Sequence, residues 1–220
     1  CRKVAREIVE KEISQVQVNA VKIKAYLGNS LFEYDEKNKE PEVGIVRGLA
    51  WTSVGGDTLS IEVNCMKGKG QLELTGKMGD VMKESAKAAI SYIRSRVHEL
   101  GIDEDFYKNT DIHIHIPEGA VPKDGPSAGI TMATAMISAL TGKKVRADIA
   151  MTGEITIRGR VLPIGGLKEK LLAAKRARMN TVIVPIQNKR TVEELEENVT
   201  EGIEIIFASE MDDVLKHVFA

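Results

Sequence analysis

The chain has 220 residues, of which 43% are hydrophobic, so it can bury the core of one domain or of one domain with an appendage. Its 31 Lys and Arg residues balance 32 Asp and Glu residues for a formal net charge of −1, which argues against a basic domain built to hold nucleic acid. No apolar run approaches a membrane span and no signal-peptide pattern opens the chain, so a membrane protein is not expected. The two cysteines, Cys1 and Cys65, form no disulfide framework, which is typical of a reducing compartment such as the cytoplasm.

The first forty residues are predicted to form a short helical appendage followed by a linker. Residues 1–12 place apolar side chains at helical spacing among charges, and residues 17–27 indicate a second short helix or an extended link. The stretch YDEKNKEPE at 34–42 is charged and poor in apolar residues, so we place a domain boundary close to Pro41. Because residue 1 is Cys and not Met, we expect the chain to begin inside a longer polypeptide.

The segment that follows the linker is predicted to form strands and one long helix. Residues 44–54 and 57–63 have strand character on either side of Gly55-Gly56, which is a hairpin signal. The other elements expected in this segment are a strand at 70–76, a helix with one apolar stripe at 79–100, and a half-buried strand at 111–116.

From residue 111 onward the pattern alternates between strands and helices. This alternation predicts an α/β architecture, and the sequence contains no internal repeat. The elements expected here are a helix at 127–140, strands in 147–157 and 160–164, a helix near 166–178, a strand at 181–185, a helix at 191–198, a strand at 204–208 and a last helix from Met211.

A single serine, Ser127, stands at the start of the helix made of very small residues. Proline and glycine stiffen and bend its approach, and Pro126 suits the first helical position, since its missing N–H would be unpaired there. Ser127 is then predicted to lie in the first turn, where free backbone N–H groups would stabilise an alkoxide or an oxyanion. The alternative is that Ser127 simply caps the helix, as serine commonly does. The residues of the approach are Pro117, Gly119, Pro122, Gly125 and Pro126.

A nucleophilic serine needs a base, and the histidines are weak candidates. His113 and His115 alternate with isoleucines, so both lie on one face of a strand. No third metal ligand with suitable spacing accompanies them, so we interpret this face as solvated and expect no metal site. His98 and His217 lie on charged helical stretches. A Ser-His-Asp triad stays open, but no arrangement in the sequence nominates one.

Lys170 is a stronger candidate for the base. On a helical wheel from Leu167, most charged residues of the helix fall in other sectors, whereas Lys170 lies among alanines and leucines. Leu172 and Arg178 break this pattern. Burial would disfavour the charged amine and lower its pKa from about 10.4, which a base at neutral pH requires. The alternative is that Lys170 lays its stem on the alanines and holds its amine in water.

The stretch MTGEITIRGRVLPIGG at 151–166 separates the serine from the lysine. We expect a hairpin here that delivers the lysine helix, and the Thr152 hydroxyl could orient an amine. The glycines do not fit G-x-x-x-x-G-K-[ST] or G-x-G-x-x-G, so we interpret them as turn residues and not as a phosphate cradle.

The segments PKDGPSAGITMATA and MTGEITIRGRVLPIGGLKEKLLAAKRA closely resemble the proteolytic domain of the bacterial, ATP-dependent Lon proteases, as do 48–63 and 76–96. The resemblance covers 41–220 and implies a mixed sheet packed with helices, while 1–40 is similar to the end of the helical subdomain of the preceding AAA+ ATPase module. It implies a catalytic dyad of Ser127 and Lys170. It further implies that Thr152 hydrogen-bonds the lysine and that Asp124 lies in a loop that switches between active and inactive shapes.

The resemblance also implies partners and a cellular role. The substrates would be unfolded or damaged polypeptides, degraded by serine endopeptidase chemistry in protein quality control and the stress response. The full-length protein would be a cytoplasmic homohexamer that uses ATP and Mg²⁺, whereas this chain would need no cofactor. The alternative is a non-catalytic Lon-like module for assembly or for association with DNA, although the net charge of −1 argues against DNA.

Overall fold

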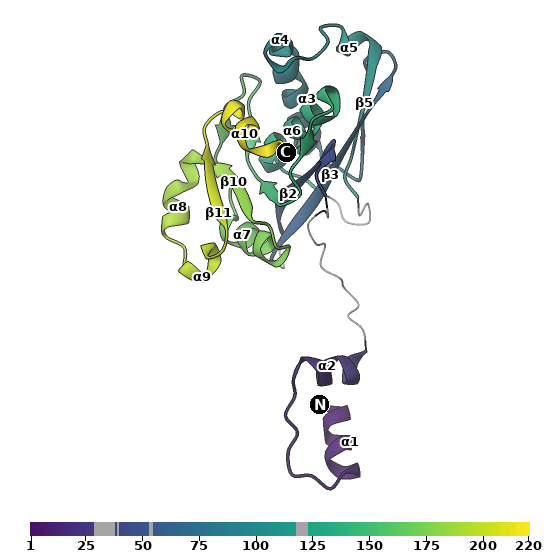
Figure 1. Cartoon of the computed structure of the whole chain (residues 1–220), viewed down its shortest axis with the longest axis vertical. Coiled ribbons are helices and arrows are strands. Elements are labelled where there is room, and N and C mark those ends of the chain that lie inside the picture. The colour runs from purple at the N-terminus through teal and green to yellow at the C-terminus, as the bar shows by residue number, and fades with distance from the viewer. Residues whose placement is uncertain (29–37, 39, 53–54, 118–122) are drawn as a thin grey trace. The chain divides into compact units, whose positions relative to one another are not determined.

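The computed structural model describes residues 1–28, 38, 40–52, 55–117 and 123–220. The chain divides into two compact units, Cys1–Asp35 and Glu36–Ala220 (Figure 1). Within the described ranges, no helix combines the length and apolar character that a membrane crossing requires.

The first unit contains two short helices, as predicted. They are α1 (Arg2–Glu10) and α2 (Ala20–Leu27), and neither contains a buried residue. Asn19 caps α2 by accepting a hydrogen bond from the Lys22 backbone N–H at 3.0 Å. The carboxylate of Glu7 on α1 accepts a hydrogen bond from the Tyr26 hydroxyl on α2, so polar contacts join the two helices.

The second unit is built on a seven-stranded mixed sheet with the order β11-β10-β7-β2-β3-β5-β4. The neighbours β11, β10, β7 and β2 are parallel, β3 runs antiparallel to both β2 and β5, and β4 is parallel to β5. The predicted mixed sheet with helices and the predicted N-terminal helices are confirmed. The strands are β2 (Ile45–Thr52), β3 (Gly55–Lys67), β4 (Leu72–Thr75), β5 (Thr110–His115), β7 (Ile149–Met151), β10 (Thr181–Pro185) and β11 (Glu204–Ala208).

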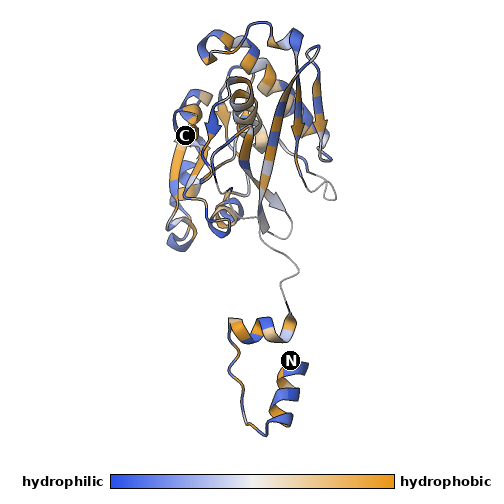
Figure 2. Cartoon of the chain, turned by 45° about the vertical axis from the view of Figure 1, so that its right-hand side comes forward, coloured by the Kyte–Doolittle hydropathy of each residue, from blue (hydrophilic) through white to orange (hydrophobic). Residues whose placement is uncertain are grey.

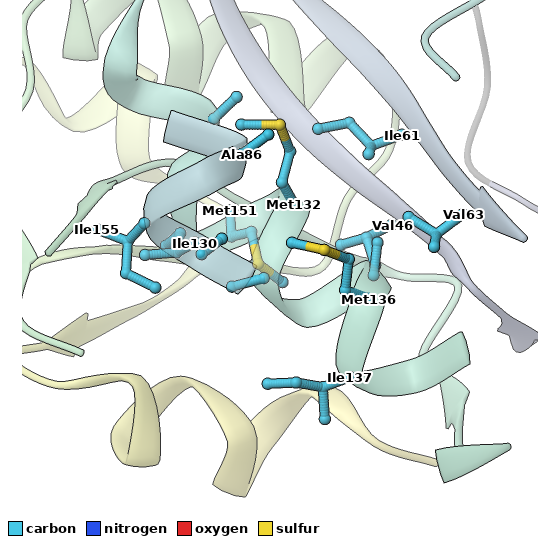
Figure 3. Packing of buried hydrophobic residues seen from close by; sticks show 14 of the residues in the cluster. Val46, Ile61, Val63, Ala86, Ile130, Met132, Met136, Ile137, Met151 and Ile155 are labelled. Atoms are coloured by element: carbon cyan, nitrogen blue, oxygen red, sulfur yellow. The ribbon is translucent and has the colours of Figure 1, made fainter. Parts of the chain in front are cut away.

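Helices cover both faces of the sheet at its centre. One apolar cluster joins α3 (Asp80–Ser95) and α6 (Gly129–Thr141) to one face, and a second joins α7 (Leu167–Arg176) to the other. Alternate residues of β10 divide between the clusters, with Ile183 in the first and Val182 in the second, as successive residues of a strand must. Figure 3 shows strand residues of the first cluster facing methionines of α6.

Hydrophobic and hydrophilic residues alternate along the strands β3, β5 and β4 (Figure 2), so this part of the sheet has one apolar face and one polar face. Ile112 and Ile114 are buried, whereas His113 and His115 point to the opposite face. Thr75 Oγ1 lies 2.8 Å from His113 Nε2 and 2.7 Å from His115 Nδ1. In the ranges described, no group of three or more His, Cys, Asp or Glu side chains is arranged to hold a metal ion.

Several predicted elements are shorter than expected or divided. The long helix predicted at 79–100 ends at Ser95, and α4 (Val97–Leu100) follows, because Arg96 leaves helical geometry with ψ of 19°. The predicted strand 147–157 is divided into β7 and β8 (Glu154–Ile155), and β8 pairs with β9 (Val161–Leu162) instead of the main sheet. Two short helices, α8 (Lys189–Glu193) and α9 (Glu197–Thr200), replace the single helix predicted at 191–198. The structure also contains elements that were not predicted, namely α5 (Phe106–Asn109) and the antiparallel pair β1 (Glu42–Val43) and β6 (Lys144–Val145). The last helix, α10 (Met211–Val218), is as expected.

The predicted turn at Gly55-Gly56 is wrong. Both glycines lie in β3, where Gly55 pairs with Thr52 and Gly56 pairs with Trp51. The link between the two strands is residues 53–54, which lie outside the described residues.

Candidate active site

A cavity of about 750 Å³ opens between the end of the β2–β3 hairpin, the loop before α6 and the start of α7. Ser127 and Lys170, which are 43 residues apart in the sequence, both line it. The lining residues are Leu49, Ala50, Trp51, Thr52, Asp57, Leu59, Met82, Lys123, Asp124, Pro126, Ser127, Ala128, Pro163, Ile164, Gly165, Gly166 and Lys170.

Ser127 lies in a short 3₁₀ turn, η1 (Pro126–Ala128), and not in the first turn of the α-helix as predicted. Pro126 occupies the start of this turn, where its missing N–H costs nothing. Neither η1 nor α6 has a capping hydrogen bond from a side chain, which contradicts the interpretation of Ser127 as a helix cap. The predicted roles of Gly119 and Pro122 fall on residues outside the described ranges.

The backbone of Ser127 is fixed by the segment that follows β7. Its carbonyl accepts a hydrogen bond from the Gly153 N–H at 2.8 Å, and the Gly153 carbonyl accepts one from the Ile130 N–H at 3.1 Å. These two bonds hold the 3₁₀ turn beside the carboxyl end of a central parallel strand. Ser127 is half-buried and lines the cavity.

Lys170 lies on α7 and is 2% exposed, so the alternative in which its amine extends into water is wrong. Its Nζ donates a hydrogen bond to Thr152 Oγ1 at 3.0 Å. Among the described residues, no carboxylate forms an ion pair with this amine, so no opposite charge offsets the cost of burying its charge. Desolvation by burial lowers the pKa of Lys170 to about 8.

Thr152 connects the lysine to the serine residue. It is fully buried directly after β7, and its hydroxyl donates a hydrogen bond to the Ser127 carbonyl at 3.3 Å. Because the one proton of this hydroxyl is donated to the Ser127 carbonyl, the hydroxyl oxygen can only accept a hydrogen bond from the Lys170 amine. A neutral Lys170 that donates one N–H to Thr152 keeps its lone pair free to take a proton.

Asp124 ties the loop before Ser127 to α3. Its carboxylate accepts hydrogen bonds from the Met82 N–H at 3.0 Å and from the Gly125 N–H at 2.9 Å. The N-cap of α3 is Gly79, which has no side chain, so Asp124 satisfies a free N–H of the first turn from 42 residues away. The predicted switching of this loop stays a prediction.

Two cavity residues were not anticipated from the sequence. Lys123 is 9% exposed, and its amine donates to the Pro117 carbonyl at 2.9 Å. Trp51 is 60% exposed at the cavity wall, although large aromatic side chains are usually buried. The hydropathy pattern could not identify them. A lysine in a loop and a tryptophan at a strand end give the same local pattern whether they line a cavity or lie on the surface without a function.

Comparison with known proteins adds a family relationship. The sequence profile of the family described as "Lon protease (S16) C-terminal proteolytic domain" matches residues 17–220. "Lon protease 1" of Bacillus subtilis (strain 168) is 58% identical over 217 residues, covering 99% of this chain and 28% of the relative.

Two further relatives support the same family relationship. "Lon protease" of Lachnoclostridium phytofermentans is 63% identical over 204 residues, covering 93% of this chain and 25% of the relative. "Lon protease" of Clostridioides difficile (strain 630) is 58% identical over 217 residues, covering 98% of this chain and 28% of the relative. The chain thus spans about a quarter of the length of the relatives it matches.

Proposed function

This chain belongs to the family of Lon protease (S16) C-terminal proteolytic domains, and from this membership we propose that it is a serine endopeptidase in which Ser127 is the nucleophile and Lys170 is the general base. Membership of the family makes it a peptidase domain that acts on protein substrates. The assignment of the two residues is our own proposal.

The observation that carries the proposal is the path of contacts from the Lys170 amine through the Thr152 hydroxyl to the Ser127 residue, with both ends at one cavity. A lysine at its ordinary pKa is protonated near neutral pH and cannot act as a base. The buried Lys170, with a pKa lowered to about 8, is neutral in an appreciable fraction of molecules at mildly alkaline pH.

The proposed reaction proceeds through an acyl-enzyme. The lone pair of Lys170 Nζ takes the proton of Ser127 Oγ as the oxygen attacks the carbonyl carbon of a peptide bond. Backbone N–H groups of the 3₁₀ turn that follow Pro126 stabilise the oxyanion. The protonated Lys170 gives its proton to the leaving amine of the substrate. The Lys170 amine, now neutral again, activates a water molecule that hydrolyses the ester.

The test is cleavage of a fluorogenic peptide by the wild type, Ser127→Ala and Lys170→Ala. We expect either substitution to lower the rate by on the order of a thousandfold or more, since nucleophile and base act as one unit. Lys168→Ala is the matched control: it lies on the same helix outside the cavity lining, with a side chain 48% exposed and paired with Glu196. Equal rates in wild type, Ser127→Ala and Lys170→Ala would refute the dyad.

The expectations for the full-length protein are proposals of the same kind. We propose that residues 1–40 end an AAA+ helical subdomain, that the whole protein is a cytoplasmic homohexamer using ATP and Mg²⁺, and that its substrates are unfolded or damaged proteins. This sequence lacks the G-x-x-x-x-G-K-[ST] pattern, so no step of the reaction above involves ATP. We therefore expect slow, ATP-independent cleavage of short or already unfolded polypeptides.

A non-catalytic role in assembly or DNA association is the competing interpretation. The discriminating measurement is retention on DNA over a series of salt concentrations, run beside the peptide assay. Salt-sensitive retention without peptide cleavage would favour the competing interpretation.

A further inference from the structure

The hairpin β2–β3 contacts the backbone of the helix that holds Lys170. A Cβ atom built on Gly56 would lie 1.9 Å from the Glu169 carbonyl oxygen and 3.0 Å from the Lys170 backbone nitrogen. Separations below 3.0 Å are essentially never seen for real Cβ atoms, and the obstructing atoms are backbone that cannot rotate away. The backbone of β3 therefore lies directly against the first turn of α7.

Steric room alone demands a glycine at position 56. Gly56 is not among the residues with positive φ, so its backbone would accept a side chain. Its neighbour Gly55 is the opposite case, with φ of +128° and no heavy atom near a built Cβ. The pair thus contains one glycine needed for its conformation and one needed for its contact with α7.

Two other contacts fix α7 against the same hairpin. The guanidinium of Arg176, the last residue of α7, donates a hydrogen bond to the Gly56 carbonyl. At the other end, a Cβ on Gly166, the N-cap of α7, would lie 2.8 Å from Trp51 Cβ. Since Trp51 pairs with Gly56 across the hairpin, one pair of strand residues contacts the helix at its start, its first turn and its last residue.

We propose that Gly56 is a positioning residue for Lys170: its bare backbone seats the first turn of α7 and so sets how deeply the Lys170 amine lies beside Thr152. This inference rests on the proposed role of Lys170 as the general base. It adds that the depth of the proposed base is set from the hairpin side of the cavity, by a residue that is not among those lining the cavity.

The consequence for chemistry follows from the surroundings of the amine. Burial is the cause that lowers the pKa of Lys170, so any outward movement of α7 returns that pKa toward its ordinary value. A methyl group at position 56 must push β3 and α7 apart, which admits water to the amine. Below both pKa values, the neutral fraction of an amine falls tenfold for each pH unit that its pKa rises.

The experiment compares Gly56→Ala with Gly55→Ala in the whole chain, using the pH profile of kcat/KM on the fluorogenic peptide. We expect Gly56→Ala to move the midpoint up by about one pH unit, which lowers the rate at pH 7 about tenfold and lowers it less above the new midpoint. Gly55→Ala strains the same hairpin without meeting α7, so it should lower the melting temperature and leave the midpoint unchanged. Midpoints that stay unchanged in both variants, or that rise equally in both, would overturn the proposal.

A second readout separates this inference from the proposed function. The pKa of Lys170 is measured directly by NMR of labelled lysine in a Ser127→Ala background, with and without Gly56→Ala. A rise caused by Gly56→Ala supports the positioning role, and no rise overturns it, whatever the peptide assay says about the dyad. If Gly56→Ala does not fold, Arg176→Gln replaces it, because this variant removes the hydrogen bond to the Gly56 carbonyl. The proposal then requires Arg176→Gln to raise the pKa of Lys170, by less than is expected of Gly56→Ala.

Discussion

At the scale of single residues, the chemistry proposed for this site depends on the balance between the burial of Lys170 and the lack of a negative partner. A carboxylate beside the amine would stabilise the charged form and hold its pKa near or above the ordinary value. Thr152 instead offers a neutral acceptor at 3.0 Å, which orients the amine without restoring its charge. The hydroxyl is therefore suited to orient the proposed base at little cost to its basicity.

The pH dependence of cleavage follows from this balance. We expect kcat/KM to rise as Lys170 loses its proton, with a midpoint near the pKa of about 8 that burial produces. The measurement is the rate on the fluorogenic peptide between pH 6 and 9, in buffers of constant ionic strength. A profile that stays flat over this range would contradict a lysine base.

Removing the Thr152 hydroxyl should impair catalysis while preserving the fold. Thr152→Val keeps the shape of the side chain but deletes the acceptor of the Lys170 N–H and the donor to the Ser127 carbonyl. We expect kcat to fall by on the order of a hundredfold, because the amine loses its orientation toward the serine. Thr152→Ser keeps the hydroxyl and should recover most of the activity; equal losses in both variants would mean that packing, and not hydrogen bonding, is what matters.

The buried lysine should also reduce the stability of the fold. Its pKa is about 8 in the folded state and 10.5 ordinarily, so between these values the unfolded chain binds a proton that the folded chain does not. The penalty, about 3 kcal/mol by linkage, is fully present below pH 8 and disappears as the pH rises toward 10.5.

Lys170→Met should therefore raise the free energy of unfolding at pH 7 by about 1–2 kcal/mol, since a lost bond to Thr152 offsets part of the gain. Urea denaturation of both proteins at pH 7 and pH 10 checks whether Lys170→Met is the more stable at pH 7 and whether this difference in stability shrinks at pH 10. A destabilised Lys170→Met protein at pH 7 would show that the amine is stabilised by contacts other than Thr152.

At the scale of elements, the loop before Ser127 and helix α3 stabilise each other through Asp124. Asp124→Ala deletes the acceptor of the Met82 N–H, so we expect a loss of about 1 kcal/mol in the free energy of unfolding together with reduced activity. Asp80→Ala is the control within the same helix turn, because its side chain is 95% exposed and should change stability by less than about 0.5 kcal/mol. Chemical denaturation of both variants makes the comparison, and equal stabilities would mean that Asp124 does not cap α3.

The sequence could predict the elements better than the contacts between them. The helical wheel identified Lys170 as a cation among alanines and leucines, and its burial is confirmed because amphipathic spacing is a local property. The close contact of Gly56 with α7 could not be predicted, since a glycine beside a hairpin signal looks the same whether it forms a turn or lies against a helix backbone. Asp124 likewise caps a helix 42 residues away, and no local pattern carries that information.

At the scale of the whole second unit, the site arises where a central strand stops short. The strand β7 has only three residues, and Thr152 and Gly153 continue beyond it between α6 on one face of the sheet and α7 on the other. The 3₁₀ turn with Ser127 precedes α6, and Lys170 lies on α7. The carboxyl end of β7 therefore brings together groups from opposite faces, in agreement with the tendency of parallel sheets to bind ligands at this edge.

The distribution of buried residues predicts that the second unit folds without the first. Every buried apolar residue among those described lies between Val46 and Val218, and neither α1 nor α2 buries a residue. The fragment 36–220 should therefore melt within about 2 °C of the whole chain and cleave the fluorogenic peptide at the same rate.

A slightly shorter fragment, 46–220, is the matched control. It also removes β1, which pairs with β6, and Ile45, the first residue of β2. It further removes Gly44, whose N–H donates to Ser138 Oγ at 2.8 Å and whose carbonyl accepts from the Val63 N–H at 2.7 Å. Losing these two bonds at buried or half-buried positions should cost about 2 kcal/mol or more, which calorimetry would detect as a clear drop in melting temperature. If 36–220 melted as early as 46–220, residues 1–35 would contribute stability that α1 and α2, which bury no residue, do not explain, and the two units would have to be treated as one folding unit.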